Sequence, residues 1–315
     1  MAVTFLTNKD VSPRNLLDNS DFCNPVNQRG LIQYKGIRYG IDRWYLWHEK
    51  GYNGWMVSLN DGCIKVSDNP DSTSQTVNML RQDIAVDPRL RGKTVTFVAK
   101  LKGNWMCRLN INNVNAYIGQ YTAYKDAAGT PYSDEEWHIR SWQGVIPEDA
   151  DTFFVGLQSK PWTDPNDSTN KIICPYYCEW VALYEGAYTD GNFYVLKDDS
   201  GKEYYGQLGP NNLPEYRPKG YAAEHLECQR YYVDFGEMTF RSAVSKITAD
   251  GVAYNVINIP FPVPMRVYPT ITNATAVEGT IPELPDVLPT GISYFSVGER
   301  YILRYVSASA DFPIP

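Results

Sequence analysis

The sequence predicts an all-β protein of two modules, a β-sandwich followed by a short helix and a second, smaller β-sandwich. Three observations support this fold class. Short runs with apolar residues at every second position recur along the chain, separated by clusters of Gly, Pro, Asn and Asp. Only one stretch has the composition of a convincing helix. That helix follows two prolines within Leu213–Phe235, the stretch that divides the chain into a longer first part and a shorter second part.

The composition allows two folded domains and argues against some partners. The chain has 315 residues, of which 43% are hydrophobic, enough for two ordinary cores. The net charge is −7, with a sequence pI near 5.1. Nucleic acids and anionic membranes both attract basic surfaces, so neither is expected as the main partner.

Two further features bear on the site of synthesis and on cofactors. No segment is apolar for long enough to cross a membrane, and the first residues lack a secretory signal, so synthesis in a cytoplasm is expected. The six cysteines are scattered, which without export favours free, mostly buried thiols. Cys174 and Cys178 lie four residues apart without a second pair or a nearby His, so neither a zinc site nor another cofactor is expected.

Residues 1–14 are expected to form a short arm, and residues 15–190 the first module. Its clearest strand is Thr94–Lys102, where apolar and polar residues alternate strictly. Further alternating runs occur at residues 108–112, 153–157 and 180–184. Many short strands with frequent turns and little helix are typical of a β-sandwich or barrel.

Residues 191–234 are expected to form a linker and the joint helix, and residues 235–315 the second sandwich. Tyr194–Leu208 is interpreted as a hairpin or an extended linker. The helix is expected from about Ala222 to Tyr231, where aromatic and β-branched residues take over. In the second sandwich, the main strands are expected at residues 253–259 and 300–306.

Three segments resemble a family of bacteriophage and prophage tail-fibre or receptor-binding proteins. The first segment comprises Asn15–Phe22 (NLLDNSDF), Asn24–Gly30 (NPVNQRG) and Ile41–Trp44 (IDRW). The second is Ala223–Tyr232 (AEHLECQRYY), entered through a proline-containing extended segment. The third is Phe261–Arg266 (FPVPMR), followed by Pro269 and Thr270. The three segments follow the family's order and span nearly the whole chain.

The first module also resembles carbohydrate-binding modules in the order of its elements. The resembling segments are LRGKTVTFVAKLKG, a Trp-bearing strand, IPEDADTFFVGL and WVALYEG. This order implies a jelly-roll sandwich. Such modules often hold a structural calcium ion, for which Asp18, Asp21 and Glu179 stand at matching places. Cys23 replaces an expected carboxylate, and both aspartates also suit turn bonding, so no metal site is predicted.

No catalytic signature occurs in the sequence. The histidines His48, His138 and His225 form no zinc-protease pattern, and neither a nucleophile elbow nor a phosphate loop is present. Glycoside hydrolysis needs two carboxyl groups, and the candidates are Asp134, Glu135, Glu136, Glu148, Asp149 and Asp151. These residues lie in polar, turn-like runs where solvated charge is the simpler interpretation, so no enzymatic activity is predicted.

Aromatic side chains are the candidate ligand-binding groups, because sugar rings stack on them. Trp44 and Trp180 lie in strongly patterned segments and are expected in the core. The predicted stacking residues lie among polar residues whose amides suit sugar hydroxyls: Trp105, Tyr117, Tyr121, Tyr124, Trp142 and Trp162. The alternative is that these rings are packing residues. Tyrosines of the second module, Tyr268, Tyr294 and Tyr301, form a rival contact surface.

The tail-fibre resemblance implies a virion protein that is made in a bacterial cytoplasm and binds a glycan or another receptor on a bacterial surface. It also implies other virion proteins as partners and a homotrimer with the joint helices near the three-fold axis, without membrane insertion. Three weak sites on one particle would bind more tightly through effective concentration. Two alternatives stay open: a structural head-fibre or capsid-decoration protein, and a glycan-degrading virion enzyme.

Overall fold

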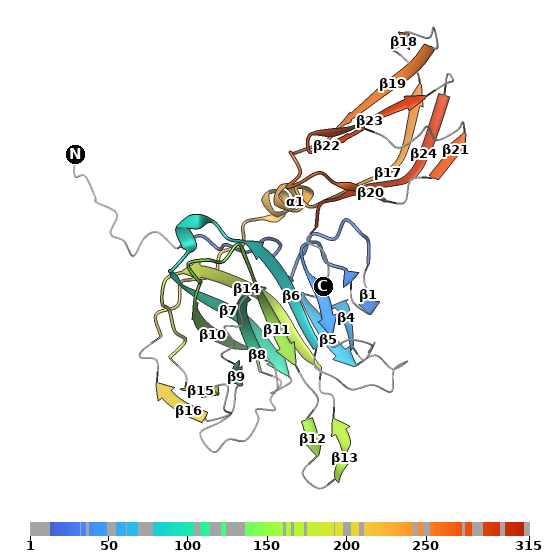
Figure 1. Cartoon of the computed structure of the whole chain (residues 1–315). Helices are drawn as coiled ribbons and strands as arrows, with labels where there is room; N and C mark the ends of the chain where they lie inside the picture. The colour runs from blue at the N-terminus through green and yellow to red at the C-terminus, as the bar shows by residue number, and fades with distance from the viewer. Residues whose placement is uncertain are drawn as a thin grey trace, which may run out of the picture. The chain divides into compact units, whose positions relative to one another are not determined.

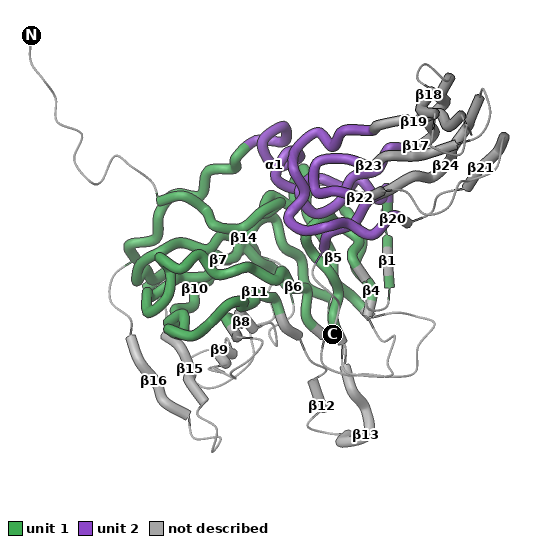
Figure 2. Tube along the Cα trace, turned by 45° about the horizontal axis from the view of Figure 1, so that its top comes forward, with its two compact units in different colours: residues 1–25, 31–219 green, residues 26–30, 220–315 purple. Residues whose placement is uncertain are grey.

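The computed structural model describes residues 13–31, 33–35, 38–48, 55–60, 62–68, 78–103, 108–113, 121–123, 136–159, 162–164, 167–172, 175–191, 193–197, 203–207, 211–241, 245–247, 253–272, 275–278, 286–296 and 300–311. Contacts divide the chain into two compact units (Figure 2), residues 1–25 with 31–219 and residues 26–30 with 220–315. By contact, the joint helix and residues 26–30 group with the second unit, and residues 191–219 group with the first.

The first unit is a jelly roll, in which one long antiparallel ribbon folds over on itself (Figure 1). Outward from the β8–β9 hairpin, β7 pairs with β10, β6 with β11 and β5 with β14. Successive pairs belong alternately to two sheets, so the ribbon wraps around one core. The paired strands are β5 (Cys63–Asp68), β6 (Asn78–Ala85), β7 (Thr94–Gly103), β8 (Arg108–Asn113), β9 (Tyr121–Ala123), β10 (His138–Val145), β11 (Thr152–Ser159) and β14 (Tyr176–Glu185).

Within the described residues, sheet A has the strand order β1-β4-β5-β14-β7-β10, and sheet B has the order β16-β15-β9-β8-β11-β6-β3-β2. The remaining elements of this unit are β1 (Gln33–Lys35), β2 (Arg38–Tyr39), β3 (Tyr45–His48), β4 (Trp55–Asn60), η1 (Pro88–Leu90), β12 (Trp162–Asp164), β13 (Asp167–Ile172), β15 (Phe193–Lys197) and β16 (Glu203–Gln207). β15 and β16 pair as an antiparallel hairpin, one of the two interpretations of this stretch.

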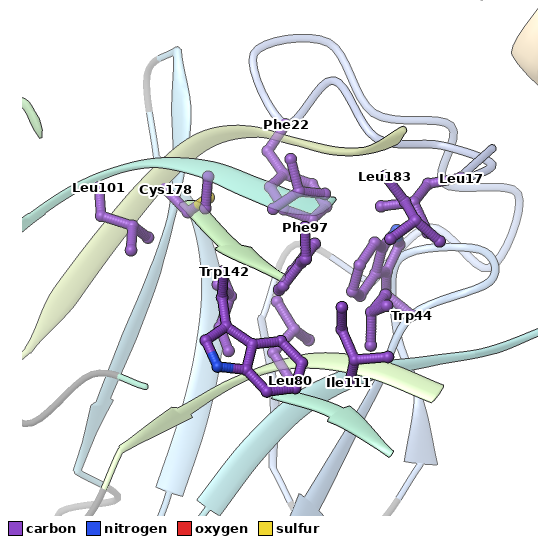
Figure 3. Packing of buried hydrophobic residues seen from close by; sticks show 14 of the residues in the cluster. Leu17, Phe22, Trp44, Leu80, Phe97, Leu101, Ile111, Trp142, Cys178 and Leu183 are labelled. Carbon is purple, nitrogen blue, oxygen red and sulfur yellow. The ribbon is translucent and has the colours of Figure 1, made fainter. Parts of the chain in front are cut away.

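The core of the first unit lies between the two sheets and follows from strand alternation. The core residues of β7 are Val95, Phe97, Ala99 and Leu101, as their period-two pattern predicts. Trp44 is fully buried, and its Nε1 donates to the carbonyl oxygen of Asn19 at 2.9 Å. Its position among Leu17 and Leu183 (Figure 3) confirms the prediction that Trp44 is a core residue.

The second unit begins with one helix and continues in strands. The helix is α1 (Tyr221–Gln229), where the sequence predicted it. One sheet contains β17 (Tyr232–Arg241), β20 (Thr270–Thr272), β21 (Thr275–Glu278) and β24 (Arg300–Ser309). The other contains β18 (Ser245–Ile247), β19 (Ala253–Pro260), β22 (Asp286–Leu288) and β23 (Gly291–Ser296). The predicted fold class, a jelly-roll sandwich followed by a short helix and a smaller β-sandwich, is confirmed.

Three parts of the sequence that are far apart along the chain are in contact within the second unit. Gln28 donates from Nε2 to the carbonyl oxygen of Tyr232 at 2.8 Å, and the guanidinium of Arg29 lies 3.8 Å from the centroid of the Tyr232 ring. Arg29 also forms an ion pair with Asp311. The backbone N–H of Arg266 donates to the carbonyl oxygen of Arg230 at 2.8 Å. Within the second unit, part of each segment that carries the tail-fibre resemblance, namely residues 26–30, 230–232 and Arg266, is therefore close in space to the other two.

Helix α1 buries polar side chains and exposes apolar ones. Glu224 is 3% exposed, whereas Tyr221 and Leu226 are about half exposed, at 49% and 50%. Among the described residues, no helix has the length and apolar character needed to cross a membrane.

Candidate functional site

The outer face of sheet A carries a row of cationic and aromatic side chains. The row consists of Lys65 on β5, Tyr177 on β14, Lys102 on β7 and Trp137 directly before β10, and we call it the lysine–aromatic row. Tyr177 pairs through the backbone with both Lys65 and Lys102, so the three residues lie side by side on neighbouring strands. All four side chains are partly exposed.

The strands that carry the row are anchored in the core by their alternate residues. Tyr176 and Cys178 flank Tyr177 in the sequence and are fully buried. Ile64 and Val66 flank Lys65 and are also fully buried, and Leu101 precedes Lys102 with 7% exposure. Because successive side chains of a strand point to opposite faces, this burial fixes the row on the face away from the core.

The lysines and the rings alternate at contact distance. The Nζ atom of Lys102 lies 5.0 Å from the ring centroid of Tyr177 and 5.1 Å from that of Trp137. Lys65 Nζ lies 5.8 Å from the Tyr177 centroid, and Lys100 Nζ lies 5.4 Å from the Trp137 centroid. These distances are within the range of cation–π attraction. One strand separates the two rings, which corresponds to a spacing of about 10 Å.

A β-bulge places one carboxylate beside the row. The pairing of β14 with β7 shifts between Cys178 and Trp180, so Glu179 is an extra residue in β14. Its carboxylate forms an ion pair with Lys100. Among the described residues, the three lysines Lys65, Lys100 and Lys102 outnumber the carboxylates of Glu179 and of Glu136, which directly precedes Trp137. One positive charge therefore remains here, although the whole chain has a net charge of −7.

The neighbouring part of the same face is closed by the chain itself. The ring of Tyr216 stacks on Trp180, with centroids 4.2 Å apart and an interplanar angle of 1°. Tyr188 packs edge-on against Tyr184, at 6.2 Å between centroids. Leu213 joins these residues in a small apolar cluster over sheet A. The lysine–aromatic row lies on the remaining part of this face, where its side chains are partly exposed.

The outer face of sheet B has a chemically similar group of side chains that is buried. Arg81 forms an ion pair with Asp83 at 2.7 Å, and its guanidinium lies 4.0 Å from the ring centroid of Phe154. The hydroxyl of Tyr45 donates to the other Asp83 oxygen at 3.0 Å. All four residues are at most 7% exposed. We call them the buried arginine cluster. Burial, followed by the charge of Asp83, raises the pKa of Tyr45 far above its usual value.

Of the six predicted stacking residues, Trp142 is described in full and contradicts the prediction. It is 4% exposed and belongs to the main core (Figure 3). Its polar neighbours lie on the other face of β10, where they bond to the chain that covers sheet A. Ser141 exchanges hydrogen bonds with Asp190, and Gln143 donates to the carbonyl oxygen of Tyr188 at 2.6 Å. The polar residues beside Trp142 in the sequence therefore do not indicate that Trp142 lies on a polar surface.

The other five predicted stacking residues are not tested by the structure. Trp105, Tyr117 and Tyr124 lie outside the described residues. Tyr121 is in β9 and Trp162 in β12, and only their backbone positions are described. Sequence reasoning missed Trp137 and Tyr177. One signal could have identified Tyr177: it alternates with Tyr176 and Cys178 in a segment that continues as a buried strand, so its side chain should point away from the core.

The carboxylates considered for calcium are engaged with protein groups. Asp18 is paired with Arg43 at 3.2 Å, and Glu179 with Lys100. Asp21 accepts from the backbone N–H of Cys23 at 3.1 Å, as expected for a turn. Within the described ranges, no three His, Cys, Asp or Glu residues form a group that could hold a metal ion.

Comparison with known proteins gives structural similarity without a family assignment. The sequence matches no family model and no curated protein. A structure described as "CBM4 structure and function" is similar over 54% of this chain and 99% of its own, with 17% identity and a TM-score of 0.34. TmCBM61 in complex with β-1,4-galactotriose covers 55% of this chain and 99% of its own, with 10% identity and a TM-score of 0.33.

The CBM22-2 xylan-binding domain from Paenibacillus barcinonensis Xyn10C is also similar, over 53% of this chain and 98% of its own. Its identity is 16% and its TM-score 0.27. These three chains are similar to about half of this protein. The class that the fold itself defines is a jelly-roll β-sandwich with a second β module.

Proposed function

We propose that this protein is a non-catalytic virion protein that binds a glycan on a bacterial surface through the lysine–aromatic row. One observation carries the proposal. Trp137 and Tyr177 lie partly exposed on one sheet face, with Lys102 between them. Flat rings on a fixed platform suit the apolar faces of sugar rings, and the flanking ammonium groups can donate hydrogen bonds to sugar oxygens.

The assignment to a virion, as a tail-fibre or receptor-binding protein, rests on the sequence resemblance. It is supported by the contacts of Gln28, Arg29 and Arg266 with residues 230–232, because they give the three resembling segments a common structural task. The proposed partners are other virion proteins, and the proposed place of synthesis is a host bacterial cytoplasm.

A homotrimer is part of the same proposal. The half-exposed Tyr221 and Leu226 on α1 are apolar groups that a neighbouring copy could cover. Light scattering coupled to size exclusion tests this directly, with an expected mass near three times 35.8 kDa. A monomer at all accessible concentrations would contradict the trimer and would leave the glycan site as a monovalent one.

Binding of the full chain to purified cell-wall polysaccharides of candidate hosts, measured by calorimetry, tests the glycan site. We expect Tyr177→Ala to weaken binding roughly two- to tenfold, because one stacking plane is lost. Tyr268→Ala is the matched variant in the second unit, where Tyr268 is 69% exposed and belongs to the rival surface. If Tyr268→Ala weakens binding and Tyr177→Ala does not, the contact lies in the second unit. Release of reducing ends from the polysaccharide would contradict the non-catalytic assignment.

A further inference from the structure

We infer that the lysine–aromatic row selects a saccharide that carries carboxylates on its sugar rings, as polymers of uronic acids do. This inference rests on the proposed glycan-binding function and names its ligand class. Its starting point is the local charge. Lys65, Lys100 and Lys102 outnumber the neighbouring carboxylates of Glu179 and Glu136, so this face is locally positive in a protein of net charge −7. A neutral glycan would gain little binding energy from a locally positive surface on a negatively charged protein.

The positions of the lysines indicate where the negative charge lies on the ligand. Lys102 Nζ is almost equidistant from the two ring centroids, at 5.0 and 5.1 Å. A sugar ring stacked on either aromatic side chain therefore places its own substituents within reach of Lys102. A carboxylate bonded directly to a ring carbon meets this ammonium group without leaving the stacked position.

The order of groups across the strands suits a linear polymer laid perpendicular to β5, β14, β7 and β10. Charge and stacking plane alternate as Lys65, Tyr177, Lys102 and Trp137. At the end of the row, Lys100 is the second cation beside Trp137, at 5.4 Å from its ring centroid. Repeating units that each present one ring face and one carboxylate match this alternation.

The test uses polygalacturonate and its carboxyl-reduced counterpart, a neutral polymer with the same linkage. We expect the full-length protein to bind polygalacturonate, to bind the reduced polymer at least tenfold more weakly, and to lose affinity as salt is added. Lys102→Gln should weaken binding of polygalacturonate about two- to fivefold and binding of the reduced polymer by a smaller factor, because the glutamine amide keeps a hydrogen-bond donor but loses the charge. Trp137→Ala should weaken binding of both polymers, because stacking does not depend on charge.

The possible failures are distinguishable. Equal binding of both polymers, with no effect of Lys102→Gln, would overturn the carboxylate inference and leave the glycan function standing. Absence of binding to both polymers and to purified cell-wall polysaccharides would overturn the proposed function itself. Tighter binding of inorganic polyphosphate or of single-stranded oligothymidylate than of polygalacturonate would overturn the inference in favour of phosphate or nucleic-acid recognition, since aromatic residues beside lysines also bind single strands.

Discussion

The outer faces of the two sheets both carry cationic and aromatic side chains, which are buried on sheet B and partly exposed on sheet A. On sheet B, Arg81, Asp83 and Tyr45 satisfy one another in a buried position beside Phe154. On sheet A, Lys102 lies between Tyr177 and Trp137 at a partly exposed position. The comparison shows that a set of cations and rings does not identify a binding site by itself. Side chains that are buried and paired with one another, as in the buried arginine cluster, stabilise the fold. Side chains that remain in contact with water, as in the lysine–aromatic row, can exchange that water for a ligand.

The largest expected effect comes from breaking the buried arginine cluster. Arg81→Met leaves the carboxylate of Asp83 buried without its cation, which typically costs about 3–5 kcal/mol of the free energy of unfolding. The matched variant on the open face is Lys102→Met, for which we expect a cost of at most about 1 kcal/mol. Denaturant unfolding of both variants, followed by the fluorescence of the first unit, measures the difference. Equal losses would mean that the two faces do not differ as described.

An intermediate effect is expected where the chain closes sheet A over Trp180. Tyr216→Ala removes a ring stacked at 4.2 Å and should destabilise the first unit by about 1–3 kcal/mol, less than for a fully buried aromatic residue. It also uncovers Trp180, so acrylamide should quench a larger fraction of the tryptophan fluorescence. Tyr216→Leu is the control that keeps apolar cover. Unchanged quenching in Tyr216→Ala would show that Trp180 is covered by other groups.

Trp180 also shows what the sequence could and could not predict. Alternation correctly placed the core residues of β7, and the position and length of α1 followed from helix-forming residues after Pro218. Alternation also led to the prediction that Trp180 is a core residue, but Trp180 is partly buried and packs against the small apolar cluster over sheet A, outside the main core. The bulge at Glu179 moves Trp180 to the outer face of sheet A, and a single extra residue leaves no mark in the composition.

The candidate site was hidden from sequence reasoning for a related reason. Its members come from β5, β14, β7 and the start of β10, which are neighbours only through the nested pairing of the jelly roll. Each lysine or ring alone is an ordinary surface residue of a strand. Trp142 is the opposite case, a residue that looked like part of a binding site and is not. Its polar neighbours Ser141 and Gln143 form hydrogen bonds to Asp190 and Tyr188, which are far away in the sequence.

A smaller effect is expected at high pH from Tyr45. Its pKa is raised by burial and then by Asp83, so the folded protein keeps this proton while the unfolded chain loses it above the ordinary value of 10.0. The unfolded state then binds fewer protons, and the free energy of unfolding falls as pH rises through that value. Tyr45→Phe should cost about 1 kcal/mol at neutral pH, through the lost bond to Asp83, and should make the alkaline fall shallower.

Urea unfolding from about pH 8 to about pH 11 measures this slope. Some of the slope should persist in Tyr45→Phe, because burial and Tyr188 raise the pKa of Tyr184 to about 12. The double variant with Tyr184→Phe should therefore be flatter than either single variant. An unchanged slope in Tyr45→Phe would mean that the hydroxyl of Tyr45 ionises freely in the folded protein.

The smallest effect reports on the charge beside the open row. Cys23 is exposed, yet burial of its thiol, then Asp21, then Glu179 raise its pKa to about 11. Glu179→Gln removes one of the lesser causes and should lower this pKa, so iodoacetamide should label Cys23 faster than in the parent protein. Asp21→Asn should act more strongly, since Asp21 raises this pKa through its charge, a larger effect than that of Glu179, and also through a side-chain hydrogen bond.

Peptide mass spectrometry separates the labelling of Cys23 from that of the other thiols. Glu179→Gln also frees Lys100 from its ion pair, so the same variant should bind polygalacturonate more tightly than the parent protein. Faster labelling without tighter binding would mean that Lys100 does not contribute to the ligand. Tighter binding without faster labelling would mean that the charge of Glu179 acts on the row and not on Cys23. Together the two readouts decide whether the bulge in β14 sets the charge of the open face.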